Sequence, residues 1–352
     1  MSEGTDGAVT NPPGRQPRTR PTMRDVAALA RVSLKTVSRV INGETTVAPD
    51  LATRVHRAAA ALDYRPNLTA RNLRSSDGRT RTIGVLLENV ANPFSSALHR
   101  AIEDVARARG VAVFASSIDE DPERERELAL ALIARRVDGL IIAPAGDDQS
   151  YLANERRAGL SLVYADRPPQ LLRADTVLSD HAIGARTAVR HLIEHGHVRI
   201  GFLGDLREIP TAADRFTGYS QALAASGIDV DEKLVHFDLH SVDAAQAAAR
   251  SLILGPKPTA LFATQNLITI GVLRALRELR LSDRIALVGF DDFLLADILQ
   301  PAVTVVAQDP AAIGATACRM LFQRMDGDSS PPQTQTIPTR LIARGSGEIL
   351  PS

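Results

Sequence analysis

Short apolar segments alternate with amphipathic helical segments over roughly the last 270 residues, and this alternation constrains the fold more than any other feature. The segments with the length and composition of buried strands are 82–87, 111–116, 139–143, 161–165, 199–203, 260–263 and 286–290. Such alternation predicts an α/β fold with parallel sheets covered by helices on both faces. Because this length exceeds one ordinary doubly wound unit, we expect two lobes with a cleft between them.

The charge of the chain is distributed unevenly. Residues 1–80 contain 13 Lys and Arg against 7 Asp and Glu, a surplus of 6 positive charges, whereas the remainder contains 28 against 34. Phosphate groups are attracted by the first segment and repelled by the second. Any nucleic-acid contact is therefore expected in the first 80 residues, although a basic segment that is merely soluble has the same composition.

The composition also limits the cellular location. Cys318 is the one cysteine of the chain, so no intramolecular disulfide can form. Residues 1–21 carry several prolines but no apolar signal region, and no apolar run approaches the length of a membrane span. We expect a cytoplasmic protein with no membrane segment, in which residues 1–21 form a disordered basic tail.

Residues 22–64 have the apolar spacing of three short helices, interrupted by two turns. Thr22 and Asp25 have the spacing of a capping box, which predicts the start of the first helix. Its buried stripe is expected to consist of Val26, Leu29 and Ala30.

A second helix is expected over residues 34–42, with Ser33 as its N-cap. A turn of three residues joins it to the first helix, which is typical of a helix-turn-helix. On its open face, Lys35 and Arg39 can donate hydrogen bonds to guanine, whereas Leu34 can contact a thymine methyl group. The expected phosphate contacts are Thr36, Ser38 and Asn42. In isolation, the paired basic residues would more commonly be a solvated helix face, but the capping box, the turn and the segment Tyr64-Arg65-Pro66-Asn67 together favour DNA contact.

These segments resemble the lactose-repressor (LacI/GalR) family of bacterial transcription regulators. The matching motifs are Met23-Arg24-Asp25-Val26-Ala27, Val32-Ser33, Thr36-Val37-Ser38-Arg39-Val40, Asn42-Gly43, and Tyr64-Arg65-Pro66-Asn67 followed by Ala70 and Leu73. The similarity continues to about residue 344 and so covers nearly the whole chain after the tail. It implies a headpiece over residues 22–64, and a hinge helix and linker over residues 65–80.

The resemblance implies that the hinge folds on operator DNA and that Leu73 wedges between base pairs from the minor groove. An apolar side chain flanked by Arg71 and Arg74 has the composition of such a wedge. The alternative is that Leu73 packs on the rest of the protein. The complete expected DNA-binding set is Thr22, Ser33, Leu34, Lys35, Thr36, Ser38, Arg39, Asn42, Tyr64, Asn67, Ala70, Arg71 and Leu73.

The resemblance also implies a periplasmic-binding-protein-like body over residues 81–352 that holds a small effector between its lobes. The lobe boundaries are expected at about 81–180 with 308–336 for lobe one, and 181–307 with 337–345 for lobe two. The expected effector-binding residues are Phe94, Asp166, Asp180, Arg215, His240, Gln265 and Asp291. Carboxylates and an arginine at strand ends suit polyols, whose hydroxyls donate to Asp and accept from guanidinium. The aspartates could instead cap helices, and Arg215 could form a surface ion pair.

Two positions depart from the family pattern. His240 stands where relatives often stack an aromatic ring, and Ser95 stands where a second aromatic is expected after Phe94. We expect a sugar or polyol effector, with a nucleoside or another metabolite acting as a corepressor as the alternative.

Together these features predict a homodimeric repressor that binds a near-palindromic double-stranded operator. No enzyme activity, cofactor or metal is expected, because nucleophile and phosphate-binding motifs are missing and His191, His195 and His197 do not share one helix face. A cytoplasmic solute-binding protein and a sugar-modifying enzyme are the two other classes.

Overall fold

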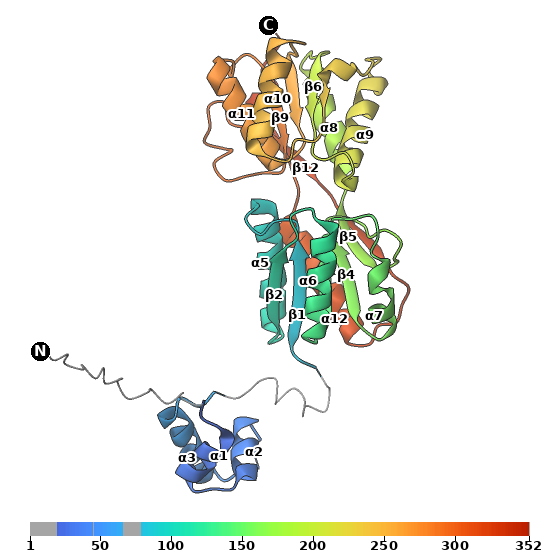
Figure 1. Cartoon of the computed structure of the whole chain (residues 1–352). Helices are drawn as coiled ribbons and strands as arrows, with labels where there is room; N and C mark the ends of the chain where they lie inside the picture. The colour runs from blue at the N-terminus through green and yellow to red at the C-terminus, as the bar shows by residue number, and fades with distance from the viewer. Residues whose placement is uncertain (1–19, 45, 66–78, 352) are drawn as a thin grey trace, which may run out of the picture. The chain divides into compact units, whose positions relative to one another are not determined.

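The computed structural model describes residues 20–44, 46–65 and 79–351, and it divides into two compact units. The first unit ends at Thr80 and contains the headpiece, and the second begins at Arg81 and forms the body (Figure 1). Most of the predicted tail and the predicted hinge helix lie outside the described residues. The hinge residues that fall outside are Asn67, Ala70, Arg71 and Leu73.

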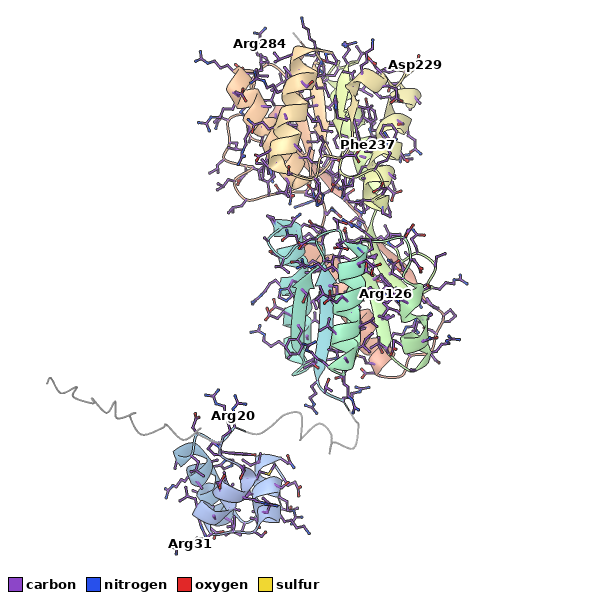
Figure 2. All side chains as sticks on the ribbon, viewed as in Figure 1. Arg20, Arg31, Arg126, Asp229, Phe237 and Arg284 are labelled. Atoms are coloured by element: carbon purple, nitrogen blue, oxygen red, sulfur yellow. The ribbon has the colours of Figure 1, made fainter. Side chains whose placement is uncertain are left out.

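The headpiece consists of the three predicted helices. They are α1 (Met23–Ala30), α2 (Leu34–Ile41) and α3 (Pro49–Ala61). The predicted capping box is confirmed, because the Thr22 hydroxyl accepts from the Asp25 amide at 3.4 Å and the Asp25 carboxylate accepts from the Thr22 amide at 2.7 Å. At the other end of α1, Arg54 donates to the carbonyl oxygens of Ala30 and Arg31 (Figure 2 labels Arg31). Both ends of α1 thus have partners for backbone groups that the helix leaves free.

The headpiece core corrects one prediction from the sequence. Val26, Ala27 and Ala30 form the buried stripe of α1, whereas the side chain of Leu29 is 53% exposed. Successive helical residues are about 100° apart, so a stripe centred on Ala30 includes Val26 and Ala27 but leaves Leu29 on the flank. The prediction that Leu29 is buried was wrong.

The body contains two six-stranded sheets, each of which defines one lobe. The strands of lobe one are β1 (Thr82–Leu87), β2 (Ala112–Ser117), β3 (Gly139–Ile142), β4 (Ser161–Ala165), β5 (Asp175–Ser179) and β11 (Thr334–Ile337). The strands of lobe two are β6 (Ile200–Leu203), β7 (Val235–His236), β8 (Ala260–Ala263), β9 (Ala286–Phe290), β10 (Thr304–Ala307) and β12 (Arg340–Ile342).

The two sheets repeat one topology. Their strand orders are β11-β5-β4-β3-β1-β2 and β12-β10-β9-β8-β6-β7, so each strand of lobe one has a counterpart in lobe two. The strand pairs are parallel except β10 with β12. The predicted α/β fold with parallel sheets is confirmed, and all seven predicted strands are present within one residue at either end.

Helices cover both faces of each sheet, so each lobe has two apolar cores (Figure 1). The helices of lobe one are α5 (Pro93–Ala108), α6 (Pro122–Ala134), α7 (Ala153–Arg157) and α12 (Pro310–Met325). The helices of lobe two are α8 (His181–Glu194), α9 (Pro210–Ala225), α10 (Val242–Leu254) and α11 (Asn266–Leu279). Short 3₁₀ turns span Ser150–Leu152, Glu232–Leu234 and Ser346–Glu348.

The chain crosses between the lobes three times, after β5, after β10 and after β11. Hydrogen bonds join segments that belong to different lobes or crossings. Asp180, in the first crossing, accepts from the amide of Thr339 in the third at 2.7 Å. Asn266 of lobe two donates to the side-chain oxygen of Asn92 of lobe one at 2.9 Å, and both residues are buried. The crossings are therefore coupled to each other beside the cleft.

The histidines near the end of α8 bind the C-terminal segment. His191 Nε2 lies 2.5 Å from a carboxylate oxygen of Glu348, and His197 Nε2 lies 2.7 Å from the carbonyl oxygen of Ile349. Within the described ranges, no group of three His, Cys, Asp or Glu side chains could hold a metal ion. A helix long and apolar enough to span a bilayer is likewise missing from the part of the chain that the structure describes.

Glycines allow the close approach of paired helices in the body. A Cβ added to Gly271 of α11 would lie 2.5 Å from the carbonyl oxygen of Val242 at the start of α10. Gly218 of α9 and Gly314 of α12 have the same role, with carbonyl oxygens at 2.2 and 2.4 Å from an added Cβ. These helix pairs can pack this closely only because the three positions carry no side chain.

Replacing Gly271 by alanine should lower the free energy of unfolding of the full chain by about 1–3 kcal/mol. Overpacking against the α10 backbone outweighs the gain in helix propensity, which is about 1 kcal/mol. Urea denaturation followed by circular dichroism measures the change. Gly255→Ala is the control at the C-cap of α10; its Cβ would lie 3.2 Å from the nearest atom, the carbonyl oxygen of Ser251, so it should destabilise the chain less than Gly271→Ala. Equal effects of both substitutions would contradict this account.

Candidate functional site

The N-terminal half of α2 forms the exposed face of the helix-turn-helix. Val37 and Val40 anchor the helix in the headpiece core, while Leu34 and Lys35 are exposed. The Ser33 side chain accepts from the Thr36 amide at 3.0 Å, as predicted for an N-cap. Leu34 and Lys35 are thus held in the first turn of a capped helix, where a recognition helix contacts base edges.

The other predicted DNA contacts are partly engaged within the headpiece. Arg39 Nε donates to Glu44 at 2.8 Å, and both side chains are about half exposed. An exposed ion pair of this kind is worth little, so a base or phosphate can replace Glu44. Tyr64 packs against the headpiece core, whereas Asn42 is exposed.

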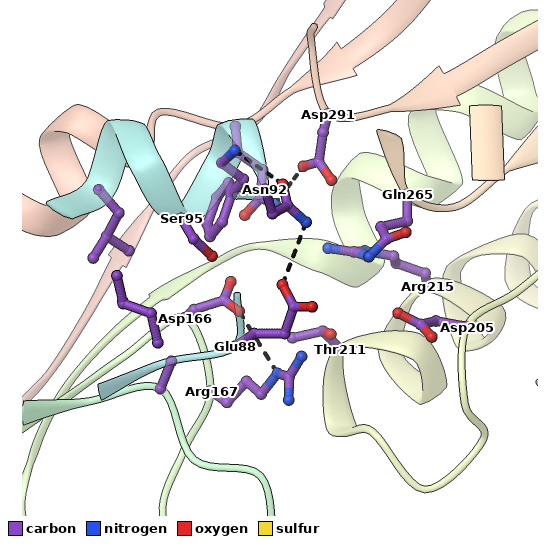
Figure 3. A pocket seen from close by; sticks show the side chains of 15 residues that line it. Glu88, Asn92, Ser95, Asp166, Arg167, Asp205, Thr211, Arg215, Gln265 and Asp291 are labelled. Atoms are coloured by element: carbon purple, nitrogen blue, oxygen red, sulfur yellow. Dashed lines mark hydrogen bonds and ion pairs between the residues drawn. The ribbon is translucent and has the colours of Figure 1, made fainter. Parts of the chain in front are cut away.

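A polar cleft lies between the two lobes of the body and has about 500 Å³ of atom-free space, including its open mouth (Figure 3). Its lining comes from both lobes. The lining residues are Leu87, Glu88, Asn92, Phe94, Ser95, Leu98, Ala143, Asp166, Arg167, Asp205, Thr211, Arg215, Gln265, Asp291 and Gln308. A concave site between two lobes with a few convergent polar groups is a common place for a small molecule to bind.

Five of the seven predicted effector residues lie in this lining. They are Phe94, Asp166, Arg215, Gln265 and Asp291. Asp180 and His240 are not among the described lining residues, and their role in effector binding stays a prediction. Asp180 binds the Thr339 amide at the crossing, and His240 Nδ1 binds the carboxylate of Asp205 at 2.9 Å. His240 therefore contacts a lining residue rather than the cleft itself.

Arg215 extends from α9 into the cleft and is only 5% exposed. Its Nη1 donates to the carbonyl oxygen of Thr264 at 2.7 Å, and its Nη2 lies 3.2 Å from His181 Nδ1. The guanidinium carbon lies 4.2 Å from the ring centroid of Phe290. The alternative of a surface ion pair was wrong, because Arg215 is buried and held in a fixed orientation.

His181 can serve as an acceptor for Arg215 because it is neutral. Burial and the neighbouring guanidinium hold the pKa of His181 well below its ordinary value. A neutral imidazole that accepts at Nδ1 carries its proton on Nε2. Arg215 and His181 therefore carry one positive charge between them, and Arg215 is the donor in the hydrogen bond that joins them.

Asp166 and Asp291 occupy equivalent places in the two lobes. Each directly follows a strand, β4 or β9, and each has a left-handed backbone with φ of 71° and 68°. The Asp166 amide donates to the Val177 carbonyl, and the Asp291 amide donates to the Val306 carbonyl, both at 2.9 Å. This geometry turns both carboxylates into the cleft. Asp166 caps no helix among the described residues, so the helix-cap alternative was wrong for Asp166. Asp291 also accepts from the backbone amide of Asn266, the first residue of α11, so that alternative holds in part for Asp291.

Burial disfavours the charged forms of both aspartates. It raises the pKa of Asp166 to about 6, although Arg167 and Arg215 oppose the shift. Burial likewise raises the pKa of Asp291, against the effects of Arg215 and of a hydrogen bond from Gln308 Nε2 at 2.6 Å. The two carboxylates also repel each other across the cleft.

Sequence reasoning missed several polar lining residues, namely Glu88, Asn92, Arg167, Asp205, Thr211 and Gln308. Two of them carried a usable signal, because Glu88 directly follows β1 and Asp205 closely follows β6, at the strand ends where sites form in parallel sheets. Gln308 follows β10, a strand that was not predicted.

Arg167 and Glu120 form a buried ion pair beside the cleft. Two nitrogens of Arg167 donate to the two oxygens of Glu120 at 2.6 Å each, and both side chains are more than nine-tenths buried. Glu88 instead accepts one long hydrogen bond from Asn92 Nδ2, at 3.4 Å. Burial and the negative charge of Glu120 raise the pKa of Glu88 to about 7.

A helix-turn-helix headpiece followed by a two-lobed body with a polar cleft defines the class of ligand-responsive DNA-binding regulators. Residues 22–67 match the family described as bacterial regulatory proteins, lacI family, and residues 189–347 match a periplasmic binding protein-like domain. The HTH-type transcriptional regulator CelR of Thermobifida fusca is 34% identical, over 94% of this chain and 99% of the relative. The chain therefore belongs to the LacI family and is a DNA-binding transcription regulator.

Solved structures agree with this assignment. The transcriptional regulator CelR–cellobiose complex is similar with a TM-score of 0.70 and 31% identity, over 93% of this chain and all of that one. The Lac repressor dimer bound to operator and the anti-inducer ONPF has a TM-score of 0.82 and 27% identity, over 94% of this chain and 99% of that one.

Replacing Glu88 by glutamine should stabilise the body above pH 7. Since the pKa is raised from 4.5 to about 7, folded Glu88 keeps a proton that the unfolded chain releases, and stability falls as pH rises from about 4.5 to about 7. A glutamine side chain does not titrate, so the substitution removes this loss, which is worth on the order of 2–3 kcal/mol above pH 7. Urea denaturation at pH 5 and pH 8 measures it.

The control for this substitution is Glu120→Gln, which should act in the opposite direction. It leaves the buried Arg167 without its charged partner, which typically costs about 3–5 kcal/mol. The free energy of unfolding at pH 8 is compared for the two variants. If Glu88→Gln lowered it as much as Glu120→Gln, Glu88 would not be a protonated side chain without an ion-pair partner, and the prediction would be wrong.

Proposed function

We propose that the chain is a homodimeric repressor that acts in the cytoplasm, binds a near-palindromic operator, and is controlled by a small polyhydroxy effector in the cleft. The observation that supports this most directly is the oriented, buried Arg215 beside Asp166 and Asp291, in a chain that also carries a helix-turn-helix. A fixed guanidinium beside carboxylates matches the alternating donors and acceptors of a polyol.

Operator recognition is assigned to the exposed turn of α2. Lys35 projects from the helix without a hydrogen-bond or ion-pair partner among the described contacts, so it is free to donate to guanine in the major groove. Leu34 supplies apolar contact beside it. The hinge residue Leu73 is proposed as the minor-groove wedge on the sequence pattern alone.

The effector is proposed to act on the closure of the lobes. Glu88 and Asp166 of lobe one face Asp205 and Asp291 of lobe two across the cleft. A ligand that donates hydrogen bonds to the carboxyl groups of both lobes favours closure. Closure changes the spacing of the two headpieces in a dimer, so effector and operator affinities are coupled reciprocally. We propose release of DNA by an inducer.

The cleft favours a sugar or polyol over a nucleoside. Phe94 is the one aromatic ring among the described lining residues, and Ser95 occupies the next position. A nucleobase is commonly held by stacking on rings, whereas one face of a sugar needs a single apolar contact and several polar partners. The CelR–cellobiose complex is a related protein with a sugar bound.

The loop after β9 offers a surface for a second copy of the chain. Four large apolar side chains are exposed within six residues, namely Leu294, Leu295, Ile298 and Leu299. Leu294 is 84% exposed. Several exposed large apolar side chains close together in a loop are typical of an interface, and a two-fold dimer would bury them against the same loop of its own copy.

Selection of random double-stranded DNA by the full chain should enrich a near-palindromic sequence. Lys35→Ala should relax base preference at one position in each half-site, at about 1–3 kcal/mol per contact. Competition binding with single-base operator variants measures this preference. Lys257→Ala removes the same charge from lobe two and should change neither affinity nor preference. Failure of the wild-type chain to enrich any palindrome at moderate salt would refute the regulator assignment.

Replacing Leu294 by aspartate should shift the protein from dimer to monomer, because a buried unpaired charge opposes association. Analytical ultracentrifugation of the full chain reports the change in mass. Leu171→Asp is the control, since Leu171 is 78% exposed but lies in lobe one, far along the chain from the loop after β9. A variant at Leu294 that stays dimeric would exclude this loop as the interface.

A further inference from the structure

Two buried asparagines join the lobes directly. Asn266 Nδ2 of lobe two donates to Asn92 Oδ1 of lobe one at 2.9 Å, and the two positions are 174 residues apart in the chain. The exposed fraction is 8% for Asn92 and 1% for Asn266. The bond between Asp180 and Thr339, by contrast, joins two of the crossings. The asparagine bond therefore links the lobes themselves, beside the cleft whose closure the effector is proposed to control.

Each asparagine is also held within its own lobe. Asn92 Oδ1 accepts from the Phe94 amide at 3.0 Å, as the N-cap of α5, and Asn92 Nδ2 donates to Glu88 at 3.4 Å (Figure 3). Asn266 Oδ1 accepts from the Leu267 amide at 2.7 Å. A side-chain atom that accepts from a backbone N–H must be the oxygen, so each amide group has one orientation. Asn266 Nδ2 is thereby directed to the other lobe.

The bond lies where two helices of different lobes begin. Asn92 is the N-cap of α5, and Asn266 is the first residue of α11. Helix N-termini carry like partial positive charge, so they repel each other unless an acceptor lies between them. Asn92 Oδ1 is such an acceptor, because it accepts from the Phe94 amide on one side and from Asn266 on the other. Separation of the lobes would break the second bond and leave the first intact.

The strength of this contact suits a bias rather than a lock. Opening the lobes would expose both asparagines to water, which replaces the lost hydrogen bond. A single neutral bond therefore changes the equilibrium between open and closed lobes by about 2- to 10-fold. Lobes held by this amount can still open, and a ligand that favours closure has less conformational free energy to supply.

We infer that Asn92 and Asn266 form a latch that stabilises the closed arrangement of the lobes before any ligand is bound. They are positioning residues, since the latch acts through the separation of the lobes and does not require either asparagine to contact the effector. This inference rests on the proposed function, because it concerns the same lobe closure that the effector is proposed to control.

The test measures lobe opening in the full chain without an effector. Ser95 lines the cleft and is 4% exposed, so a cysteine introduced by Ser95→Cys should react with iodoacetamide when the lobes open. Cys318 is fully buried in a core of lobe one, so its alkylation reports loss of the fold. Peptide mass spectrometry gives the rate of alkylation at each cysteine separately.

In the Ser95→Cys background, Asn266→Ala should speed alkylation at position 95 by about 2- to 10-fold and leave that of Cys318 unchanged. Asn92→Ser should act similarly, because serine can still cap α5 but its oxygen ends one bond short of the place of Asn92 Oδ1. The double variant should react little faster than either single variant, since both substitutions remove the same bond.

Gln149→Ala is the matched control for these variants. Gln149 is also a buried amide, with 1% of its surface exposed, but its side chain bonds the backbone of Gly146 and Gln170 within lobe one. Its replacement removes buried hydrogen bonds of the same kind without affecting the contact between the lobes. Alkylation at position 95 should therefore keep the rate of the parent.

Unchanged alkylation at position 95 in both asparagine variants would overturn the latch. A parallel rise at Cys318 would show loss of the fold in place of lobe opening, and would overturn it as well. Either result would leave the regulator assignment standing, because the DNA selection described above does not depend on the latch.

Discussion

The guanidinium group of Arg215 is buried together with the carboxylates of Asp166 and Asp291, and the polar cleft depends on this grouping. A lone charge at this depth would cost several kcal/mol, so the arginine requires nearby negative charge and fixed acceptors. The Thr264 carbonyl and neutral His181 supply the acceptors, and Phe290 supplies an aromatic face. A ligand therefore meets an arginine whose direction is set before binding, which reduces the entropy lost when the ligand binds.

The repeated topology explains why charges from distant parts of the chain meet. Counterpart strands of the two sheets end at the cleft, so β4 delivers Asp166 and β9 delivers Asp291 from opposite sides. The same relation holds for Glu88 after β1 and Asp205 after β6. Each lobe thus contributes half of the polar lining, and a ligand that contacts both halves is sensitive to the distance between them.

Much of the fold could be predicted from the sequence. Buried parallel strands are continuous apolar runs, and all seven predicted runs are strands. The strands β5, β7, β10, β11 and β12 were not predicted. β10 is a buried apolar run that was overlooked, whereas β11 and β12 lack that signature. They lie at sheet edges with exposed Thr, Gln and Arg side chains, so no apolar pattern marks them. The prediction of the buried face of α1 was wrong at Leu29, because the apolar residues of a helix of only eight residues are compatible with more than one buried face.

The site was predictable only in part. All seven candidate effector residues were placed by similarity to the family. Five of them line the cleft, whereas Asp180 and His240 contact other groups. Pairings such as Arg167 with Glu120 join positions 47 residues apart and depend on sheet order, which the sequence does not specify.

The left-handed backbone of Asp166 and Asp291 limits which residues those two places can hold. Glycine, asparagine and aspartate adopt that conformation readily, whereas β-branched side chains do not. An exchange of aspartate for asparagine there alters charge and keeps shape, so the electrostatics of the cleft can change in single steps while the strands stay in place. New ligand preferences can therefore arise in such a body by exchanges of aspartate and asparagine at positions 166 and 291, without a change in the fold.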